Sequence, residues 1–440
     1  MDYRETLTFL YENLPMFQRT GHAAYKANLD NTLRLDEALG HPHRAFRTIH
    51  VAGTNGKGSV SHLLAAMFMK AGYDTALYTS PHLLDFRERI RVNGEMIPRE
   101  AVTAFVQRHR RLIDEVAPSF FEITALMAFD HFRDRAPHIA IIETGMGGRL
   151  DSTNIIHPEL SVITNNSMDH ARFLGDTPTL TATEKAGIIK EEVPVVLGKM
   201  DPGVVPVFTE RAAALHAPLF RSDQLREILF ATETMEGCMQ VRFRNLHNDT
   251  TEQWSTDLRG IYQQENLQTA LAAADVMRRQ GWDLPVERLA LATREVSQLT
   301  KLRGRWEILA HNPQVICDTG HNEEGMRALM QQLAQVPAKH LHMIFGMVDD
   351  KEAAPILKLL PTHASYYFVR ASIPRSADPG QLREKAGRFG LQGTAYPDVS
   401  SAIRACYAKA GPRDVIFIGG STFVVADALA HFPTTGTNNP

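Results

Sequence analysis

Short apolar, β-branched runs alternate with longer amphipathic segments along this chain, and this alternation restricts its possible folds more than any other feature. In the first two thirds of the chain, five runs are typical of buried strands: residues 48–52, 74–78, 139–143, 160–164 and 193–197. Strands separated by helical segments pair in parallel, because each crossover helix packs on a face of the sheet. We therefore expect an α/β fold with a doubly wound, mostly parallel sheet in the N-terminal domain.

The same alternation stops near residue 299 and starts again after residue 305. Four further strand-like runs follow, at residues 315–317, 342–345, 366–369 and 415–418. They predict a second, smaller, Rossmann-like α/β domain. The expected organisation is an N-terminal domain, a hinge, a C-terminal domain and a disordered tail, at residues 1–298, 299–306, 307–432 and 433–440.

One segment of the N-terminal domain has a different pattern. Residues 219–258 are rich in threonine and arginine and alternate between apolar and polar side chains, as in Cys238-Met239-Gln240-Val241-Arg242-Phe243. Period-two alternation predicts antiparallel strands, followed by a helix at residues 264–279.

Composition excludes several classes of partner. The formal net charge is −3 over 440 residues, so no overall field attracts nucleic acid or an anionic membrane. Three scattered cysteines indicate neither a disulfide framework nor a zinc site. The first residues are charged where a signal peptide would be apolar. We expect a monomeric cytoplasmic protein that binds small molecules and neither nucleic acid nor membranes.

A glycine loop follows the first predicted strand and precedes a helix expected at residues 60–71. It reads Gly53-Thr54-Asn55-Gly56-Lys57-Gly58-Ser59. Glycines let backbone N–H groups approach phosphate oxygens, and the helix N-terminus and the Lys57 ammonium add positive charge. The spacing departs from the usual phosphate-loop pattern because Gly58 separates Lys57 from Ser59. The loop predicts nucleoside triphosphate binding through Thr54, Asn55, Gly56, Lys57, Gly58 and Ser59.

Two side chains follow other strands of the same predicted sheet. Glu143 ends the strand at 139–143, and His170 follows the strand at 160–164. Ligands bind at the carboxyl ends of parallel strands, so Glu143 is placed to bind Mg²⁺ and His170 to assist it. The pattern leaves two alternatives open: Glu143 could cap the turn that follows it, and His170 could be a surface or core histidine that binds no metal. Lys185, from its neighbours alone, resembles a solvated helix residue.

Several segments match motifs of one known family, in order from about residue 50 to residue 322. They are Gly53 to Ser59, Thr79-Ser80-Pro81-His82-Leu83, Arg87 to Arg91, Glu143 to Asp151, Asp169-His170, Glu184 to Ile188, Gly304-Arg305 and Asp318 to Asn322. In these segments the chain resembles the folylpolyglutamate synthases and dihydrofolate synthases of the Mur ligase superfamily, and bacterial bifunctional members above all.

The resemblance implies roles for individual residues. Ser80 and Glu143 would hold one Mg²⁺, His170 would help to hold a second, and Lys185 would be carbamylated, which makes Lys57, Glu143, His170 and Lys185 the catalytic set. ATP contacts are implied for Asn266 and, from beyond the domain junction, for Arg305, Asp318 and His321. The pterin or pteroate site is implied at Asn28, Leu29, Asp30, Asn31, Ser119, Phe120, Phe121, Glu122, Leu150, Asp151 and Ser152, with Phe121 as the stacking ring.

The implied activity is ATP- and Mg²⁺-dependent addition of L-glutamate to a folate-type carboxylate, through an acyl phosphate. Two alternatives share the ATP machinery: another Mur-type amide ligase, and a nucleotide-dependent switch or ATPase. The sequence leaves open whether dihydropteroate, tetrahydrofolates or both are the acceptors.

Overall fold

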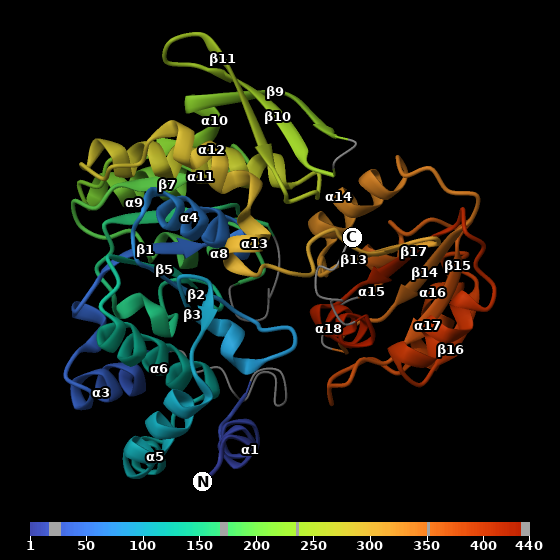
Figure 1. Cartoon of the computed structure of the whole chain (residues 1–440), viewed down its shortest axis with the longest axis horizontal. Coiled ribbons are helices and arrows are strands. Elements are labelled where there is room, and N and C mark those ends of the chain that lie inside the picture. The colour runs from blue at the N-terminus through green and yellow to red at the C-terminus, as the bar shows by residue number, and fades with distance from the viewer. Residues whose placement is uncertain (17–27, 168–174, 235–236, 350–352, 433–440) are drawn as a thin grey trace, which may run out of the picture. The chain divides into compact units, whose positions relative to one another are not determined.

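The chain forms two compact units. The computed structural model describes residues 1–16, 28–167, 175–234, 237–349 and 353–432. The N-terminal unit comprises Met1–Leu258 and Tyr262–Leu302, and the C-terminal unit comprises Arg259–Ile261 and the chain from Arg303 onward (Figure 1). The residues expected to form a hinge, 299–306, include this junction, and the last residues of helix α13 (Val296–Thr300) lie among them.

An eight-stranded sheet forms the centre of the N-terminal unit, in the order β4-β3-β2-β5-β1-β6-β7-β8. Its strands are β1 (Arg47–Ala52), β2 (Thr75–Tyr78), β3 (Ile90–Val92), β4 (Glu95–Met96), β5 (Ile139–Glu143), β6 (Leu160–Ile163), β7 (Val195–Leu197) and β8 (Leu219–Arg221). All pairs from β2 to β8 are parallel, and β3 and β4 extend one edge antiparallel. The chain runs from β1 to β2 on one side, and the later connection from β5 to β6 crosses to the other side of β1. The strand order therefore reverses at β1, and ligands of open α/β sheets bind at such a point.

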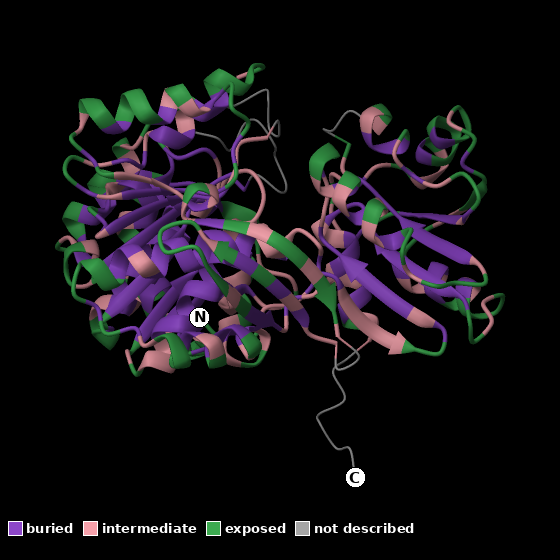
Figure 2. Ribbon diagram, turned by 90° about the horizontal axis from the view of Figure 1, so that it is seen from above, coloured by how far each residue is buried: buried purple, intermediate pink, exposed green. Residues whose placement is uncertain are grey.

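Alternate side chains of the strands fill cores on both faces of this sheet. On β5, Ile139 and Ile141 belong to the core beneath α4 and α11, whereas Ala140 and Ile142 belong to the core beneath α5 and α6. The central strands β2, β5, β6 and β7 are therefore buried along their whole length (Figure 2). Burial on both faces explains why the strands are continuous apolar runs.

The helices of the N-terminal unit cover both faces (Figure 1). Their bounds are α1 (Tyr3–Asn13), α3 (Asp30–Ala38), α4 (Lys57–Ala71), α5 (Arg99–Val116), α6 (Phe120–Arg135), α8 (Pro178–Ala186), α9 (Val205–Ala214), α10 (Ser222–Leu225), α11 (Gln263–Arg279) and α12 (Val286–Arg294), with the 3-10 helices η2 (Pro42–Arg44), η3 (Phe86–Arg89) and η4 (Ser152–Ile155).

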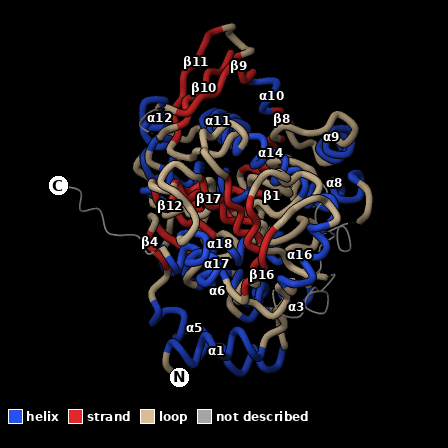
Figure 3. Tube along the Cα trace, turned by 90° about the vertical axis from the view of Figure 1, so that its right-hand side faces the viewer, coloured by secondary structure: helices blue, strands red, loops and turns tan. Residues whose placement is uncertain are grey.

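A separate antiparallel sheet packs on α11 and α12 (Figure 3). It contains β9 (Arg226–Glu233), β10 (Met239–Asn245) and β11 (Thr250–Thr256) in the order β11-β10-β9. The buried Arg226 anchors it, because its guanidinium donates to Glu252 at 2.8 Å and to Asp275 of α11 at 2.6 Å. The prediction for this segment was right for β9 to β11 and wrong at its start, because β8 pairs parallel with β7 in the main sheet.

The C-terminal unit contains a six-stranded sheet in the order β12-β13-β17-β14-β15-β16, parallel except for β12. Its elements are β12 (Glu307–His311), β13 (Gln314–Asp318), α14 (Glu323–Leu333), β14 (Leu341–Phe345), α15 (Ala353–Leu357), β15 (Ser365–Val369), α16 (Pro379–Gly387), β16 (Gly393–Tyr396), α17 (Val399–Tyr407), β17 (Val415–Gly419) and α18 (Thr422–His431). The four predicted strands are confirmed. The edge strands β12 and β16 were not predicted, since their half-exposed residues lack the apolar run of a central strand.

The α/β class predicted from the alternation is confirmed in both units. Among the residues that the structure describes, no helix combines the length and the apolar character needed to cross a membrane. The tail at 433–440 lies outside the described residues.

Candidate active site

The glycine loop lies at the carboxyl end of β1, in the middle of the main sheet. Helix α4 begins at Lys57, three residues before the predicted start, so Lys57 and Ser59 belong to its first turn. Backbone N–H groups at this end of a helix have no intrahelical acceptor. The loop and the helix start therefore offer the donors and the partial positive charge that an anionic phosphate requires.

Two glycines give the loop its shape. Gly53 has φ +150° and Gly56 has φ +82°, and a Cβ at Gly56 would lie 2.3 Å from Oδ1 of Asn266 on α11. Gln263 of the same helix links the two sides: its amide donates to Ser59 Oγ at 3.1 Å and accepts from the Asn266 amide at 2.8 Å. The structure thus places Asn266 against the phosphate loop, although the two are more than two hundred residues apart.

The residues after β6 hold the loop from the other side. Asn165 Oδ1 accepts from the backbone N–H of Thr54 at 3.1 Å and of Asn55 at 2.8 Å, and the Thr164 hydroxyl donates to the Asn55 carbonyl at 2.5 Å. Neither Thr164 nor Asn165 was among the residues predicted from sequence. Their only sequence signal is their position directly after a strand that neighbours β1.

Lys57 folds back over the loop that it follows. Its ammonium donates to the carbonyls of Gly53 at 2.8 Å and Thr54 at 3.2 Å. These bonds keep the cation beside the backbone donors, where it can contact phosphate oxygens.

Glu143 and Ser80 meet at the carboxyl ends of β5 and β2. The Glu143 side chain is buried, and its Oε2 accepts from the backbone N–H of Ser80 at 2.9 Å. The peptide bond between Ser80 and Pro81 is cis. In the turn after Glu143, the backbone N–H groups of Gly145 and Met146 donate to Asp151.

Asp151 organises the turn that follows Glu143. Its Oδ2 accepts from the N–H groups of Gly145 at 2.8 Å and Met146 at 2.9 Å, and its Oδ1 accepts from the Thr153 hydroxyl at 2.6 Å. Burial raises the pKa of Asp151, and these hydrogen bonds oppose that rise. The Thr153 hydroxyl in turn accepts from Nε2 of His50, a buried residue of β1, at 2.8 Å.

Phe121 lies beside this turn. A Cβ at Gly145 would be 2.5 Å from the Phe121 ring, and the ring is 6.1 Å from that of Tyr78. Ser119 and Glu122 form a capping box at the start of α6, and the Asn31 amide donates to Glu122 at 3.4 Å. The structure therefore connects the predicted early stretch around Asn31 with the stretch at the start of α6.

The other residues predicted for the acceptor differ in exposure. Phe120 is buried, and its ring stacks on Tyr11 at 5.6 Å. Ser152 is buried in η4 and Leu150 is half-buried, whereas Asn28 and Asp30 are exposed and Leu29, half-buried, precedes α3.

Arg89 is a buried cation that was not predicted as a site residue. It is 3% exposed, its Nε donates to His82 Nδ1 at 2.8 Å, and its guanidinium lies 5.2 Å from the Phe120 ring centre. Burial lowers the pKa of Arg89, and its electrostatic partners include Tyr78 and Glu143. Its position within a segment of three arginines, residues 87–91, was the available signal.

Lys185 is buried rather than solvated, which corrects the interpretation made from its neighbours alone. Its side chain is 1% exposed, and Nζ donates to Asn166 Oδ1 at 2.7 Å, so α8 directs the amine toward the segment after β6. His170, predicted on the same segment, lies outside the described residues.

In the C-terminal unit, Asp318 ends β13 and is buried. Its carboxylate accepts from Trp306 N–H at 2.7 Å and from Gly320 N–H at 2.7 Å. His321 Nδ1 donates to the Thr319 carbonyl at 3.0 Å, and Arg305 is half-buried. The three residues predicted to bind ATP thus lie around one strand end of this unit.

The donor set at the sheet edge suits Mg²⁺. Glu143 is a buried carboxylate, and carboxylate oxygens are hard donors for a hard cation. Ser80, whose backbone N–H contacts this carboxylate, contributes a hydroxyl oxygen, and oxygen ligands are those that Mg²⁺ prefers.

Two family models match the chain. The Mur ligase middle domain covers residues 51–274, and the Mur ligase glutamate ligase domain covers residues 304–422. A dihydrofolate synthase/folylpolyglutamate synthase of Bacillus subtilis is 33% identical over 91% of this chain and 94% of its own length.

Solved structures agree with these matches. The chain superposes on a Mycobacterium tuberculosis folylpolyglutamate synthase complexed with ADP with a TM-score of 0.86, at 27% identity, over 100% of this chain and 99% of that one. It superposes on E. coli FolC in complex with DHPP and ADP with a TM-score of 0.84, at 27% identity, over 98% of this chain and 97% of that one. The fold, the strand-end site and these similarities together show that the chain belongs to the dihydrofolate synthase/folylpolyglutamate synthase family of Mur ligases.

Proposed function

We propose that this protein is an ATP-dependent ligase that adds L-glutamate to dihydropteroate, to a reduced folate, or to both. The observation that carries the proposal is the presence of three features at the carboxyl ends of the adjacent strands β1 and β5: the phosphate loop, the buried Glu143 and the Phe121 ring against Gly145. The loop suits a triphosphate, Glu143 suits a metal ion, and an aromatic ring suits the flat pterin.

The proposed chemistry follows from the inertness of a carboxylate toward an amine. ATP transfers its γ-phosphoryl group to the acceptor carboxylate, the P–O bond to ADP breaks, and an acyl phosphate forms. The neutral glutamate amine then attacks the acyl carbon, phosphate leaves, and the nitrogen releases one proton to solvent as the amide forms. Phosphoryl transfer depends mainly on positioning and on charge stabilisation.

The residues have separate tasks in this scheme. The loop N–H groups and Lys57 bind and orient the phosphates, while Asn165 and Thr164 keep the loop in shape. Glu143 and Ser80 would hold a first Mg²⁺, and His170 with a carbamylated Lys185 would serve a second. The ions supply positive charge to the transferring phosphoryl group.

Incorporation of radiolabelled glutamate tests the proposal. Dihydropteroate and tetrahydrofolate are supplied separately as acceptors, with ATP and Mg²⁺, and ADP release is followed in the same samples. The expected result is labelled product with at least one acceptor, and ADP formation that requires both glutamate and acceptor.

Other outcomes distinguish the alternatives. ADP formation that is indifferent to glutamate and folate would support a nucleotide-dependent switch or ATPase. Glutamate-dependent turnover only with cell-wall precursors would support another Mur-type ligase. We favour the folate reading over that one because the Phe121 ring lies against Gly145, and Arg89 of the 87–91 segment is buried beside the Phe120 ring.

A further inference from the structure

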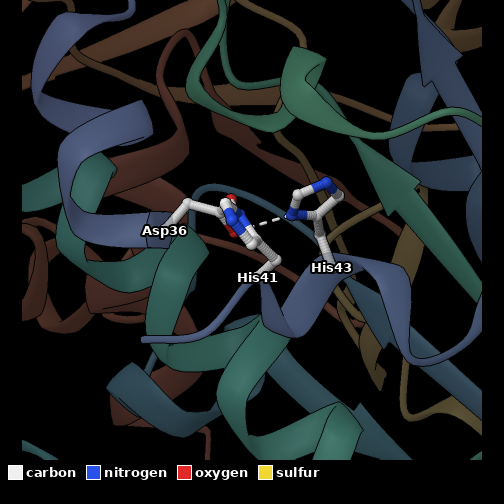
Figure 4. Close-up of side chains that lie close together, drawn as sticks. All are labelled: Asp36, His41 and His43. Atoms are coloured by element: carbon white, nitrogen blue, oxygen red, sulfur yellow. Dashed lines mark hydrogen bonds and ion pairs between the residues drawn. The ribbon is translucent and has the colours of Figure 1, made fainter. Parts of the chain in front are cut away.

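Three side chains that commonly bind metals lie together where α3 leads into β1. Asp36 is in the last turn of α3, His41 follows that helix, and His43 belongs to η2 (Figure 4). His41 Nδ1 is 2.7 Å from Asp36 Oδ2, and His43 Nδ1 is 2.6 Å from Asp36 Oδ1. Within the described ranges, this is the one group of three such side chains whose donor atoms all lie within 4.8 Å of one another.

This cluster is separate from the active site. It precedes the amino end of β1, whereas the phosphate loop follows the carboxyl end of the same strand. Six residues of strand correspond to roughly 17 Å. None of the three residues has a part in the ligation proposed above.

The burial of Asp36 requires a positive partner. Its side chain is buried although it lies at a helix C-terminus, where the helix dipole disfavours negative charge, and the last turn of α3 contains no basic residue. Arg133 of α6 approaches this turn, where it donates to the Leu39 carbonyl at 3.0 Å, but its charge is paired with Asp130. Both carboxylate oxygens of Asp36 instead face imidazole nitrogens.

The backbone holds the two histidines in position before any ligand binds. Gly40 and His41 have φ of +74° and +56°, which reverses the chain, and His41 N–H donates to the Asp36 carbonyl at 2.8 Å. A left-handed conformation is uncommon for a residue other than glycine. Pro42 is buried and starts η2, so His43 returns toward the same carboxylate.

We propose that Asp36, His41 and His43 form a binding site for a divalent transition-metal ion of the zinc type. Two imidazole nitrogens and one carboxylate oxygen are the donors of three-residue zinc sites, with water as the fourth ligand. Mg²⁺ is a poor candidate, since it prefers an octahedron of oxygen atoms.

Binding requires small movements and a defined loss of protons. Ligands of a tetrahedral zinc ion lie about 3.3 Å apart, so the N···O distances open by less than about 1 Å. A neutral imidazole moves its Nδ1 proton to Nε2, and an imidazolium releases one proton to solvent. The ion then joins the end of α3 to the segment entering β1, which stabilises the N-terminal unit by mass action.

Cobalt(II) is the probe for this site. The full-length protein is stripped with a chelator and titrated with Co²⁺ in excess Mg²⁺, which occupies oxygen-rich sites. Bound Co²⁺ is followed by its visible absorption and by elemental analysis, and Zn²⁺ is tested for its effect on Tm. We expect the parent to bind one equivalent of Co²⁺ at this site. In His41→Ala and His43→Ala the affinity for Co²⁺ should fall by about 10-fold or more, so that this equivalent is no longer bound at the same Co²⁺ concentration.

Two further variants separate metal binding from hydrogen bonding. His43→Gln retains an N–H donor for Asp36, so it should keep the metal-free Tm of the parent and lose the rise in Tm with Zn²⁺. His138→Ala removes an exposed histidine elsewhere in the unit and should bind Co²⁺ like the parent. Absence of Co²⁺ binding in the parent, or equal binding in the parent and His43→Gln, would overturn the proposal and leave a hydrogen-bonded triad.

Discussion

Lys57 and Glu143 place opposite charges around the proposed phosphoryl transfer, one at the start of α4 and the other at the end of β5. We predict that Lys57→Ala and Glu143→Ala each lower kcat by about 10³-fold or more, because the first removes a cation that stabilises phosphate charge and the second removes a proposed Mg²⁺ ligand. Steady-state glutamate incorporation measures the loss, and circular dichroism establishes that the fold is retained.

Lys70 provides the matched control for Lys57. It is a lysine at the opposite end of α4, paired with Glu295 at 2.5 Å. Lys70→Ala should retain near-parent turnover. Near-parent turnover in Lys57→Ala itself would refute the assignment of the phosphate site.

Lys185 is predicted to carry a carbamate. The buried amine would form an N–C bond with CO₂ and release a proton, which replaces a cation with an anion beside the metal ions. Lys185→Ala should be nearly inactive, and a short carboxylate such as acetate should restore part of the activity. Nuclear magnetic resonance of protein equilibrated with ¹³C-labelled bicarbonate should show a carbamate signal.

Lys190 provides the comparison for that signal. Its Nζ donates to the Asn154 carbonyl at 2.9 Å, and burial lowers its pKa, so it is a second largely buried amine in the same region. The carbamate signal should persist in Lys190→Ala and vanish in Lys185→Ala. A plain lysine at 185 in a high-resolution map of active enzyme would exclude the modification.

At the scale of elements, β1 contacts the turn after β5 through His50, Thr153 and Asp151. Burial lowers the pKa of His50 to about 3, against an ordinary value of 6.5. The folded state therefore binds fewer protons than the unfolded state between these values, so stability is full above pH 6.5 and falls as the pH drops toward 3. This histidine alone predicts a loss of about 1.4 kcal/mol between pH 7.5 and 5.5.

His50→Gln tests this effect because glutamine keeps a donor for Thr153 without titrating. The free energy of unfolding, from urea titrations at pH 7.5 and 5.5, should vary less in His50→Gln than in the parent, by about 1 kcal/mol. His138→Gln changes an exposed histidine and should keep the parental pH dependence. Equal pH dependence in the parent and His50→Gln would contradict the prediction.

At the scale of the whole molecule, ATP binding is predicted to require both units. Arg305 in the C-terminal unit is assigned to the nucleotide by family resemblance, together with Asp318 and His321. We predict that Arg305→Ala raises the KM for ATP by about 10-fold or more, since a hydrogen bond to a charged group contributes about 1.5–3 kcal/mol. Asp318→Ala should do the same and also lower stability, because Asp318 accepts from Trp306 and Gly320.

Arg303 is a suitable control in the same segment. It pairs with Glu307 at 2.8 Å within the C-terminal unit. Arg303→Ala should leave the KM for ATP near the parental value. ATP kinetics unchanged in Arg305→Ala would show that the C-terminal unit has another role.

Local patterns in the sequence were sufficient for the class of fold and for the phosphate loop. The five strands predicted in the N-terminal unit are present because burial on both faces requires continuous apolar runs, which are visible without any tertiary information. The residues at strand ends, such as Glu143, could be predicted for the same reason: parallel strands all end at one edge. Edge strands and β8 were missed or misassigned because half-exposed strands lack this pattern.

Only the tertiary structure decided which distant side chains meet. Asn165 holds the phosphate loop, Asn266 lies against Gly56, and Lys185 is buried, yet none of these facts has a local pattern. The physical reason is that a polar side chain acquires its environment from segments that the crossover connections bring together. Neighbours in sequence specify an element, whereas neighbours in space specify what its side chains bind.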